Sequence, residues 1–339
     1  MTTPYKIGVI GAGNIGTAMA ALLSQSSAEV WLTARGARLS QISAQGVVLD
    51  ERGSEIHATP KTAPQLREPM DALFVCVKSQ SLAQAIALNK AAITPETLVV
   101  PMVNGLPFWF HAQADQMNAM PLLDPDGALS GLLRPAQVLG AVLLMTVQMD
   151  AQGRATSSNT PTLSLGCVSS GADDAKIEKL VSYLDASGVR TDVTPAIREK
   201  VLVKLLANFT TNPLSALTGA MLDEIGTDPA LRDIALALAD EFRTWALGEG
   251  FELPTNAWLV DLLQDAGAFP TSMLQDALAG KPLELDAICR APHALAAAKS
   301  QAMPMMARLL EALKTDQTLP LPKPQVEALI QSLHRPIPA

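Results

Sequence analysis

Short apolar runs alternate with helical patterns between Lys6 and Met102. The runs are Lys6–Ile10, Glu29–Thr33, Asp71–Val77 and Thr97–Met102. Near-continuous apolar runs of this length are typical of parallel strands that are covered on both faces. Their alternation with helices indicates βαβ units, so the pattern predicts an α/β domain of the Rossmann type with a doubly wound parallel sheet.

The chain up to residue 194 predicts further β-structure. The residues from Val47 onward have a hairpin pattern around Arg52-Gly53. Further strands are predicted at Val138–Met149, Arg154–Thr156, Leu163–Leu165 and Val189–Val193, with a helix from Asp173 that ends at Gly188. Pro107–Arg134 is longer than an ordinary connection. Its aromatic start, Phe108–His111, suits a lid, a dimer contact or the wall of a pocket.

The pattern changes at Thr194-Pro195. Threonine is a good N-cap and proline a good first helical residue, and almost every later segment has a helical pattern. We therefore predict a Rossmann-type domain over residues 1–194 and an all-α domain over residues 195–339. In the second domain, Leu202–Gly219 predicts a buried helix that ends at Asn212-Pro213. Apolar helix faces there would suit a homodimer.

Composition narrows the class of protein. The chain has 339 residues, is 48% hydrophobic and carries a net charge of -8. It has no basic stripe with aromatic residues, so nucleic acid is not an expected partner. No apolar run reaches the ~18 residues of a membrane helix, and no signal-peptide pattern is present, so we expect a cytoplasmic protein. Three scattered cysteines indicate neither a metal site nor a disulfide framework.

The first strand runs directly into a glycine-rich loop, Gly11–Gly16, with the pattern GxGxxG. In dinucleotide sites the first glycine permits a tight turn, the second admits a pyrophosphate, and the third lets helix and strand pack closely. The helix N-terminus then offers N–H groups to the phosphates. The strand-loop-helix context favours this interpretation over a βα turn without a ligand. The predicted cofactor-binding residues of the loop are Gly11, Gly13, Asn14, Ile15 and Gly16.

The end of the second strand indicates which dinucleotide binds. An NAD site usually has Asp or Glu there, for the ribose 2′-hydroxyl. This chain has Thr33-Ala34-Arg35 instead. A guanidinium suits a 2′-phosphate, so we predict NADP(H) with Arg35 as the clamp. Arg38 is a weaker candidate, and we expect it to be a solvated surface arginine.

Two polar positions follow later strands. Lys78 comes directly after Asp71–Val77, and Asn104-Gly105 follows Thr97–Met102. Ligands of open α/β sheets bind at the carboxyl ends of strands. Each position therefore fits a cofactor contact, but also a solvated loop lysine or an ordinary Asn-Gly turn.

In the second half, Lys204, Asn208 and Asn212 are four residues apart and share one helix face. Their neighbours are apolar: Leu205, Leu206 and Phe209. Loss of water would lower the pKa of the lysine toward neutrality, so that it can donate a proton. The asparagines add donors and acceptors without charge. The alternative is a core helix with satisfied amides.

Five motifs, in this order, resemble those of the ketopantoate reductase (2-dehydropantoate 2-reductase) family. They are GAGNIG at Gly11–Gly16, VKSQ at Val77–Gln80, Asn104-Gly105, KLLANFTTNPLSALTG at Lys204–Gly219 and SMLQDALAGKPLELD at Ser272–Asp286. The fourth is the most specific, with Lys, Asn four residues on, and then Asn-Pro. The fifth is similar to the family pattern SMxxDxxxGRxTEID.

The resemblance implies NADPH-dependent reduction of 2-dehydropantoate to (R)-pantoate, a step toward pantothenate and coenzyme A. It also implies an active site in the cleft between a Rossmann domain and a helical domain. By matching position, Lys204 is the catalytic proton donor and Glu284 the acidic residue near the substrate hydroxyl. The remaining positions bind substrate (Asn208, Asn212 and Ser272) or cofactor (Arg35, Lys78 and Asn104).

The chain departs from the family pattern at Lys281, Leu283 and Arg290. Two alternatives therefore stay open. One is an NADP-dependent reductase of another branched 2-oxo acid. The other is an NADP(H)-binding sensor without turnover. The presence of both Lys204 and Glu284 argues against it, since a sensor needs no proton donor.

Overall fold

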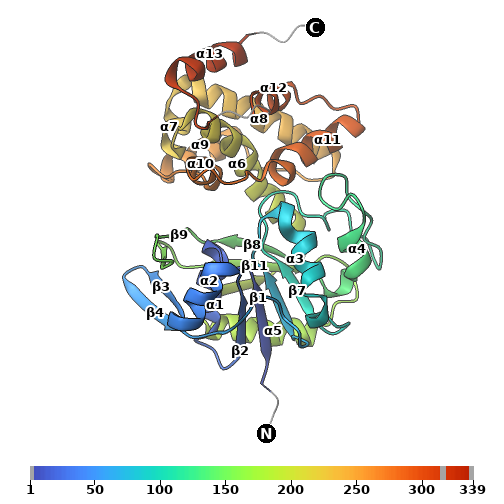
Figure 1. The fold of residues 1–339 in the computed structure, drawn as a ribbon. Helices are drawn as coiled ribbons and strands as arrows, with labels where there is room; N and C mark the ends of the chain where they lie inside the picture. Colours follow the sequence, from blue (N-terminus) through green and yellow to red (C-terminus); the bar gives the residue numbers. More distant parts are fainter. Residues whose placement is uncertain (1–3, 314–317, 336–339) are drawn as a thin grey trace. The chain divides into compact units, whose positions relative to one another are not determined.

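The computed structural model describes residues 4–313 and 318–335, and the chain folds into two compact units (Figure 1). The first unit comprises the chain up to Val103 together with Pro107–Lys200. The second comprises the chain from Val201 onward together with Asn104–Leu106. The three-residue segment Asn104–Leu106 therefore packs with a part of the chain that lies far along the sequence.

The first unit is built on a parallel sheet. Its strands, in spatial order, are β5 (Lys61–Ala63), β2 (Glu29–Thr33), β1 (Lys6–Ile10), β6 (Ala72–Val75) and β7 (Leu98–Pro101). All neighbours pair parallel. Three helices alternate with these strands along the chain: α1 (Asn14–Leu23), α2 (Gly36–Gln45) and α3 (Leu82–Leu88). The predicted strands and the doubly wound α/β class are confirmed.

Two smaller sheets complete the β-structure of the first unit. One has the order β4 (Ser54–Ala58), β3 (Val47–Glu51), β10 (Ala155–Ser157) and β9 (Val147–Met149). The other has the order β12 (Arg190–Val193), β11 (Thr162–Cys167) and β8 (Leu139–Leu144). The hairpin predicted at Arg52-Gly53 is confirmed, because β3 and β4 pair antiparallel and both turn residues have positive φ.

The prediction of one strand over Val138–Met149 is wrong, since β8 and β9 belong to different sheets. The strand is interrupted at Met145-Thr146. There the backbone N–H and the hydroxyl of Thr146 both donate to Oδ1 of Asn159, each at 2.7 Å. A side chain thus replaces the ladder partner that a continuous strand would have had.

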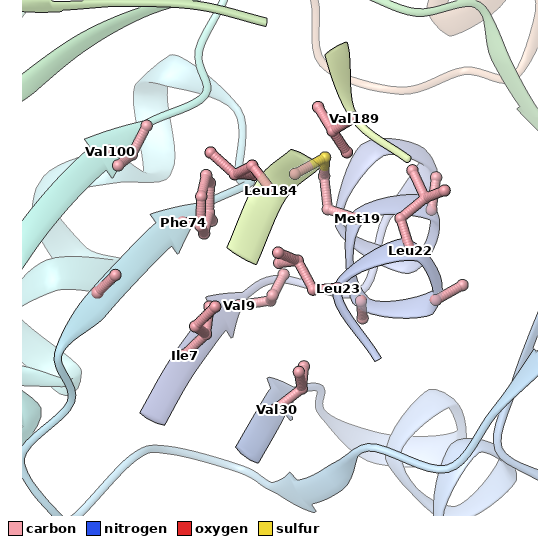
Figure 2. Close-up of a cluster of buried hydrophobic side chains, with 14 of the residues drawn as sticks. Ile7, Val9, Met19, Leu22, Leu23, Val30, Phe74, Val100, Leu184 and Val189 are labelled. Atoms are coloured by element: carbon pink, nitrogen blue, oxygen red, sulfur yellow. The ribbon is translucent and has the colours of Figure 1, made fainter. Parts of the chain in front are cut away.

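The main core lies between one face of the parallel sheet and α1, with helix α5 (Asp174–Ala186) on the same side. Figure 2 shows Ile7 and Val9 of β1 directed toward Leu23 of α1. Because successive strand residues point to opposite faces, Gly8 turns to the other face. A Cβ atom built there would come within 2.6 Å of the side chains of Leu66 and Leu73, so that face is covered as well.

The segment Pro107–Arg134 contributes to this unit's interior. Phe108, Trp109 and Phe110 are buried. The guanidinium of Arg198 lies 5.9 Å from the Trp109 ring centroid, and its Nε donates to the Phe110 carbonyl at 2.9 Å. The three aromatic rings are therefore core residues. Farther along, the buried carboxylate of Asp124 accepts backbone N–H groups at the start of α4 (Ala128–Leu132).

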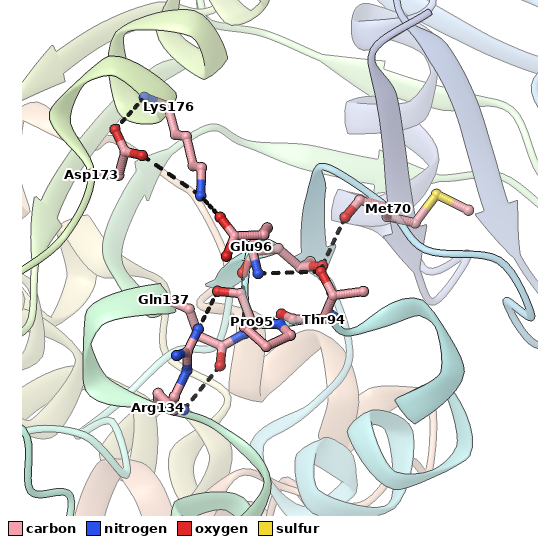
Figure 3. A network of polar contacts seen from close by, with 9 residues as sticks. Met70, Thr94, Pro95, Glu96, Arg134, Gln137, Asp173 and Lys176 are labelled. Atoms are coloured by element: carbon pink, nitrogen blue, oxygen red, sulfur yellow. Dashed lines mark hydrogen bonds and ion pairs between the residues drawn. The ribbon is translucent and has the colours of Figure 1, made fainter. Parts of the chain in front are cut away.

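Polar contacts fasten the end of this segment to the turn before β7 (Figure 3). The guanidinium of Arg134 donates to the carbonyl of Pro95, and the Gln137 amide donates to the carbonyl of Thr94 at 3.2 Å. On the other side of the turn, Lys176 of α5 pairs with Glu96. The network therefore joins α5 and the 3₁₀ turn η3 (Pro135–Gln137) to one turn of the chain.

All the regular elements of the second unit, among its described residues, are helical. Its elements are α6 (Ile197–Thr218, which begins in the first unit), α7 (Leu222–Thr227), α8 (Pro229–Gly248), α9 (Asn256–Asp265), α10 (Ser272–Leu278), the π-helical turn η4 (Asp286–Arg290), α11 (Ala291–Ala298), α12 (Pro304–Ala312) and α13 (Lys323–Leu333). The all-α class predicted for the second half is confirmed. Phe209 of α6 packs on Phe242 of α8, with ring centroids 4.9 Å apart.

Helix α6 does not end at Asn212-Pro213, so that prediction is wrong. Proline lacks the N–H that would bond to the residue four positions earlier. Yet the helix continues to Thr218, and Leu214, Ala216 and Leu217 beyond the proline are all fully buried. Burial of this apolar turn compensates for the lost hydrogen bond, because tertiary packing contributes most of the stability of such helices.

Candidate functional site

The predicted nucleotide loop, Gly11–Gly16, lies at the carboxyl end of β1. The N–H of Gly11 donates to the hydroxyl of Thr33, at the end of β2, at 3.0 Å. On the other side, the N–H of Cys76 donates to the carbonyl of Ile10 at 2.8 Å, which continues the pairing of β1 with β6. Three adjacent strand ends thus support the loop. Sequence reasoning did not identify Thr33 as a supporting residue; its position at the strand end is the only signal for it.

The three glycines of the loop have different surroundings. A Cβ atom at Gly16 would lie 1.7 Å from the carbonyl oxygen of Gly11, and one at Gly11 would lie 2.8 Å from the carbonyl oxygen of Cys76. Both glycines therefore permit close packing within the protein. Gly13 is exposed, and a Cβ atom there would meet nothing within 4 Å. The loop is open on the side where a pyrophosphate would approach.

The loop also leads into a helix with uncapped N–H groups. Gly13 is the N-cap residue of the ten-residue α1 and has no side chain to accept them. Such an N-terminus favours an anion.

The side chains of the two residues after Gly13 contact the protein. Nδ2 of Asn14 donates to the carbonyl of Val147 in β9 at 3.0 Å, so this side chain holds the neighbouring sheet. Ile15 is half-buried and packs against the main core.

The other predicted cofactor residues of the first unit lie at the same end of the sheet, where the parallel strands have their carboxyl ends. Arg35 is exposed, two residues after Thr33, and is the N-cap residue of α2. Lys78 is half-buried, three residues after the end of β6. Because β2, β1 and β6 are adjacent in the sheet, the structure brings these two residues and the loop to that end.

Arg38 is not the solvated surface arginine that the sequence led us to expect. Its guanidinium donates to the hydroxyl of Thr17 and to Oε1 of Gln41, at 2.9 and 2.8 Å. Burial lowers the pKa of Arg38. The side chain is half-buried because it bridges α1, α2 and the turn at Gly153, where a Cβ atom would collide with it.

A second group of predicted residues lies in the second unit, on one face of α6. Lys204 and Asn208 are half-buried, and Asn212 is buried, with 2% of its surface exposed. Nδ2 of Asn212 is buried and makes no hydrogen bond within the described part of the chain. The neighbouring apolar residues predicted to surround the lysine, Leu205, Leu206 and Phe209, are buried.

Lys204 has an altered acidity. Burial lowers its pKa to about 8, and the negative charge of Glu284 opposes this shift. Desolvation disfavours the charged form of an amine, whereas a nearby carboxylate favours it. Glu284 is half-buried and lies two residues before η4. The two residues predicted to be catalytic therefore interact electrostatically within one unit.

Ser272 is exposed and is the first residue of α10. The preceding residue, Thr271, is the N-cap. Its hydroxyl accepts the N–H of Leu274 at 3.1 Å and is hydrogen bonded to the Ser215 hydroxyl at 2.5 Å. A buried hydroxyl pair that the sequence did not reveal thus joins α10 to α6, and it fixes the start of the helix that carries Ser272.

Asn104, predicted to serve the cofactor, belongs to the second unit with Lys204 and Glu284. The N–H of Leu106 donates to the carbonyl of Ala287 in η4 at 2.7 Å. Gly105 has φ +90°, a conformation that favours glycine. Asn104 is therefore anchored beside the turn that follows Glu284.

The three positions that depart from the family pattern have different environments. Lys281 is exposed and Leu283 is half-buried. Arg290 donates to Oδ1 of Asp286 at 2.9 Å, one turn earlier in the same element. Arg290 is thus bound within its own helical element.

Neither a metal centre nor a membrane span is present in the parts of the chain that the structure describes. No three His, Cys, Asp or Glu side chains within 4–313 and 318–335 are grouped so as to hold a metal ion. Among the same residues, no helix combines the length and apolar character that crossing a bilayer requires.

The thiol of Cys76 lies below the Gly11–Gly16 loop. Burial raises its pKa to about 12, so that it is not a nucleophile at neutral pH.

Comparisons with known proteins agree with the division of the chain. Residues 7–170 match the family model "Ketopantoate reductase PanE/ApbA", and residues 196–317 match its C-terminal counterpart. A 2-dehydropantoate 2-reductase of Mesorhizobium japonicum is 33% identical over 299 residues, which are 86% of this chain and 91% of that protein.

Solved structures share the fold over nearly the whole chain. A structure from Ralstonia solanacearum MolK2, described provisionally as a ketopantoate reductase, has a TM-score of 0.84 at 26% identity and covers 98% of this chain and 99% of its own. A D-mandelate dehydrogenase, solved with NADH and anilino(oxo)acetate, has a TM-score of 0.77 at 20% identity and covers 97% of this chain and 100% of its own.

Proposed function

This chain belongs to the ketopantoate reductase family, and we propose that it reduces 2-dehydropantoate to (R)-pantoate with NADPH. The observation that carries the proposal is the position of Lys204, an amine with a pKa of about 8 on the same apolar helix face as two asparagines. In cells the product would lead toward pantothenate and coenzyme A.

The surroundings of the nucleotide loop fit a dinucleotide. Gly13 leaves room for a pyrophosphate, and the N–H groups at the start of α1 face it without a cap. When bound, the nicotinamide supplies the hydride. Arg35, exposed at the end of β2, would pair with the 2′-phosphate of NADPH, and Lys78 would contact the same cofactor.

Lys204 would donate a proton to the ketone oxygen, on which negative charge develops as the hydride arrives. A pKa of about 8 leaves most of the amine protonated at pH 7 and still able to release the proton readily. Glu284 has two roles in this proposal. Its charge keeps the pKa of Lys204 from falling further, and its carboxylate accepts a hydrogen bond from the substrate hydroxyl.

Asn208, Asn212 and Ser272 would hold the oxo acid. Orientation matters because the reacting carbons must meet at near-attack distance. The buried Nδ2 of Asn212 supports this role, because an unpaired buried donor costs about 1–3 kcal/mol and a substrate oxygen would relieve that cost. Asn104, anchored beside η4, would contact the cofactor.

The experiment that tests the proposal is a panel of 2-oxo acids, each assayed with NADPH and with NADH by loss of nicotinamide absorbance. We expect 2-dehydropantoate with NADPH to give the highest kcat/KM. A higher value with another branched or aromatic 2-oxo acid would assign the chain to that substrate instead. Tight NADPH binding with no turnover of any oxo acid would favour a sensor.

A further inference from the structure

The π-helical turn η4 contains a carbonyl that its own helix does not use. In a regular α-helix, the N–H of Ala291 would bond to the carbonyl of Ala287, four residues earlier. Here it bonds to the carbonyl of Asp286, five residues earlier. The next residue, Pro292, has no N–H to offer. Ala287 therefore needs a donor from elsewhere.

That donor is the N–H of Leu106, which reaches the Ala287 carbonyl at 2.7 Å. Gly105 makes the approach possible, because a Cβ atom there would lie 2.5 to 2.7 Å from the carbonyl and Cβ atoms of Ala287. Ala287 is fully buried and Leu106 nearly so, so this bond is protected from water. A buried carbonyl left without it would cost about 1–3 kcal/mol.

The turn held in this way leads directly from Glu284. The carbonyl of Glu284 accepts the N–H of Ile288 at 3.2 Å, so the residue is continuous with the helical backbone of η4. Its charge also acts on the amine of Lys204. A contact that fixes η4 therefore helps to fix the position of a charge that raises the pKa of the lysine against the effect of burial.

We propose that Gly105 and the Leu106–Ala287 backbone bond form a latch that positions Glu284, which makes Gly105 a positioning residue of the active site. The latch explains why a segment from the middle of the first domain's sequence packs with the second unit. π-Helical turns are frequent at functional sites, and this one leaves the Ala287 carbonyl available for a contact from outside its helix. The kinetic consequence of the latch rests on the proposed function, whereas the contact itself does not.

The test compares two glycines of the same unit that have nearly the same positive φ. Gly105 has φ +90° and Gly250 has φ +89°, but a Cβ atom at Gly250 would meet nothing within 4 Å. Gly105→Ala and Gly250→Ala thus both place a side chain at a positive φ, and only the first disturbs the contact with Ala287. The pH midpoint of Lys204 is measured in each by trace acetylation with peptide mass spectrometry, which detects the neutral amine without any turnover.

We expect Gly105→Ala to lower the Lys204 midpoint by about one pH unit, because the carboxylate that favours the charged amine is no longer held in place. Its kcat/KM should fall by about 10- to 100-fold. Gly250→Ala should match the wild-type chain in both measurements. Equal midpoints in the two variants would overturn the latch.

The latch can still be tested if Gly105→Ala does not fold or if the wild-type chain has no reductase activity. If Gly105→Ala does not fold, Leu106→Pro replaces it, since it removes the N–H that the Ala287 carbonyl accepts. Its midpoint should also fall, and an unchanged midpoint would overturn the proposal. If the wild-type chain reduces no oxo acid, the proposed function fails, while the acetylation midpoints still decide the latch.

Discussion

The predicted nucleotide loop and the proposed Lys204 site would support chemistry in different ways. In the loop, the relevant features are backbone N–H groups and the lack of side chains at Gly11, Gly13 and Gly16, so residue spacing alone reveals them. Lys204 is an ordinary amine whose acidity depends on the burial around it and on the charge of Glu284. The first site can be recognised as a pattern, whereas the second has to be understood through its environment.

Removing the Lys204 amine should have the largest effect. For Lys204→Ala we expect kcat to fall by about 10²- to 10⁴-fold, the usual contribution of a positioned proton donor. The dissociation constant for NADPH, measured by fluorescence titration, should change little. Lys200→Ala is the matched control, since that lysine lies on the same helix and pairs with Asp192. A Lys204→Ala kcat within about twofold of the wild type would rule out the proton donor.

Glu284→Gln tests whether the environment sets the lysine's acidity. The carboxylate raises the pKa of Lys204 against the effect of burial, so its loss should lower that pKa below about 8. The high-pH limb of the reduction rate would then move to lower pH, and kcat/KM would fall by about 10- to 100-fold. Steady-state assays across a pH series measure both quantities. An unmoved limb would mean that the charge of Glu284 does not act on the amine.

Arg35→Ala tests which dinucleotide the loop edge selects. Charge-assisted hydrogen bonds to a phosphate are worth about 1.5–3 kcal/mol. The ratio of kcat/KM with NADPH to that with NADH should therefore fall by about 10- to 100-fold. Arg67→Ala, at another exposed arginine of the same unit, should leave the ratio unchanged. The clamp would be refuted by the same ratio in both variants.

Gly13→Ala and Gly16→Ala should distinguish space that is left for a ligand from space that is needed for packing within the protein. Of the changes in activity predicted here, theirs should be the smallest. Gly13 has φ -77° and open space around its Cβ direction, so Gly13→Ala should keep the Tm of the wild type. Its affinity for NADPH should fall by about tenfold, because the methyl group occupies the path of the pyrophosphate. Gly16→Ala should instead lower the Tm, since its Cβ would collide with the Gly11 carbonyl. Normal NADPH affinity in Gly13→Ala would show that the open side is not the binding side.

Much of the fold was predictable because burial on both faces makes parallel strands continuously apolar. The exception is β5 (Lys61–Ala63), a three-residue edge strand with little apolar character. Helix α6 runs through Pro213 because the turn after it is buried, which a local rule for proline does not include. Local patterns succeed where one element determines its own structure and fail where a distant contact decides.

The candidate site shows the same limit. Motif spacing predicted the loop and the face of α6, but not that Arg38 is held by Thr17 or that Thr33 supports Gly11. The bond from Leu106 to Ala287 joins residues far apart in the sequence, and it depends on which N–H the helix leaves unused. Such contacts become visible only when the chain is folded.

The most direct test of Lys204 as the proton donor is the pH dependence of kcat/KM in both reaction directions. Reduction needs the protonated amine, so its rate should fall as the pH rises through about 8. Oxidation of the hydroxy acid needs the neutral amine, so its rate should rise over the same range. Opposite profiles with one shared midpoint are the predicted result. A reduction rate that stays level or rises through this range would contradict the account.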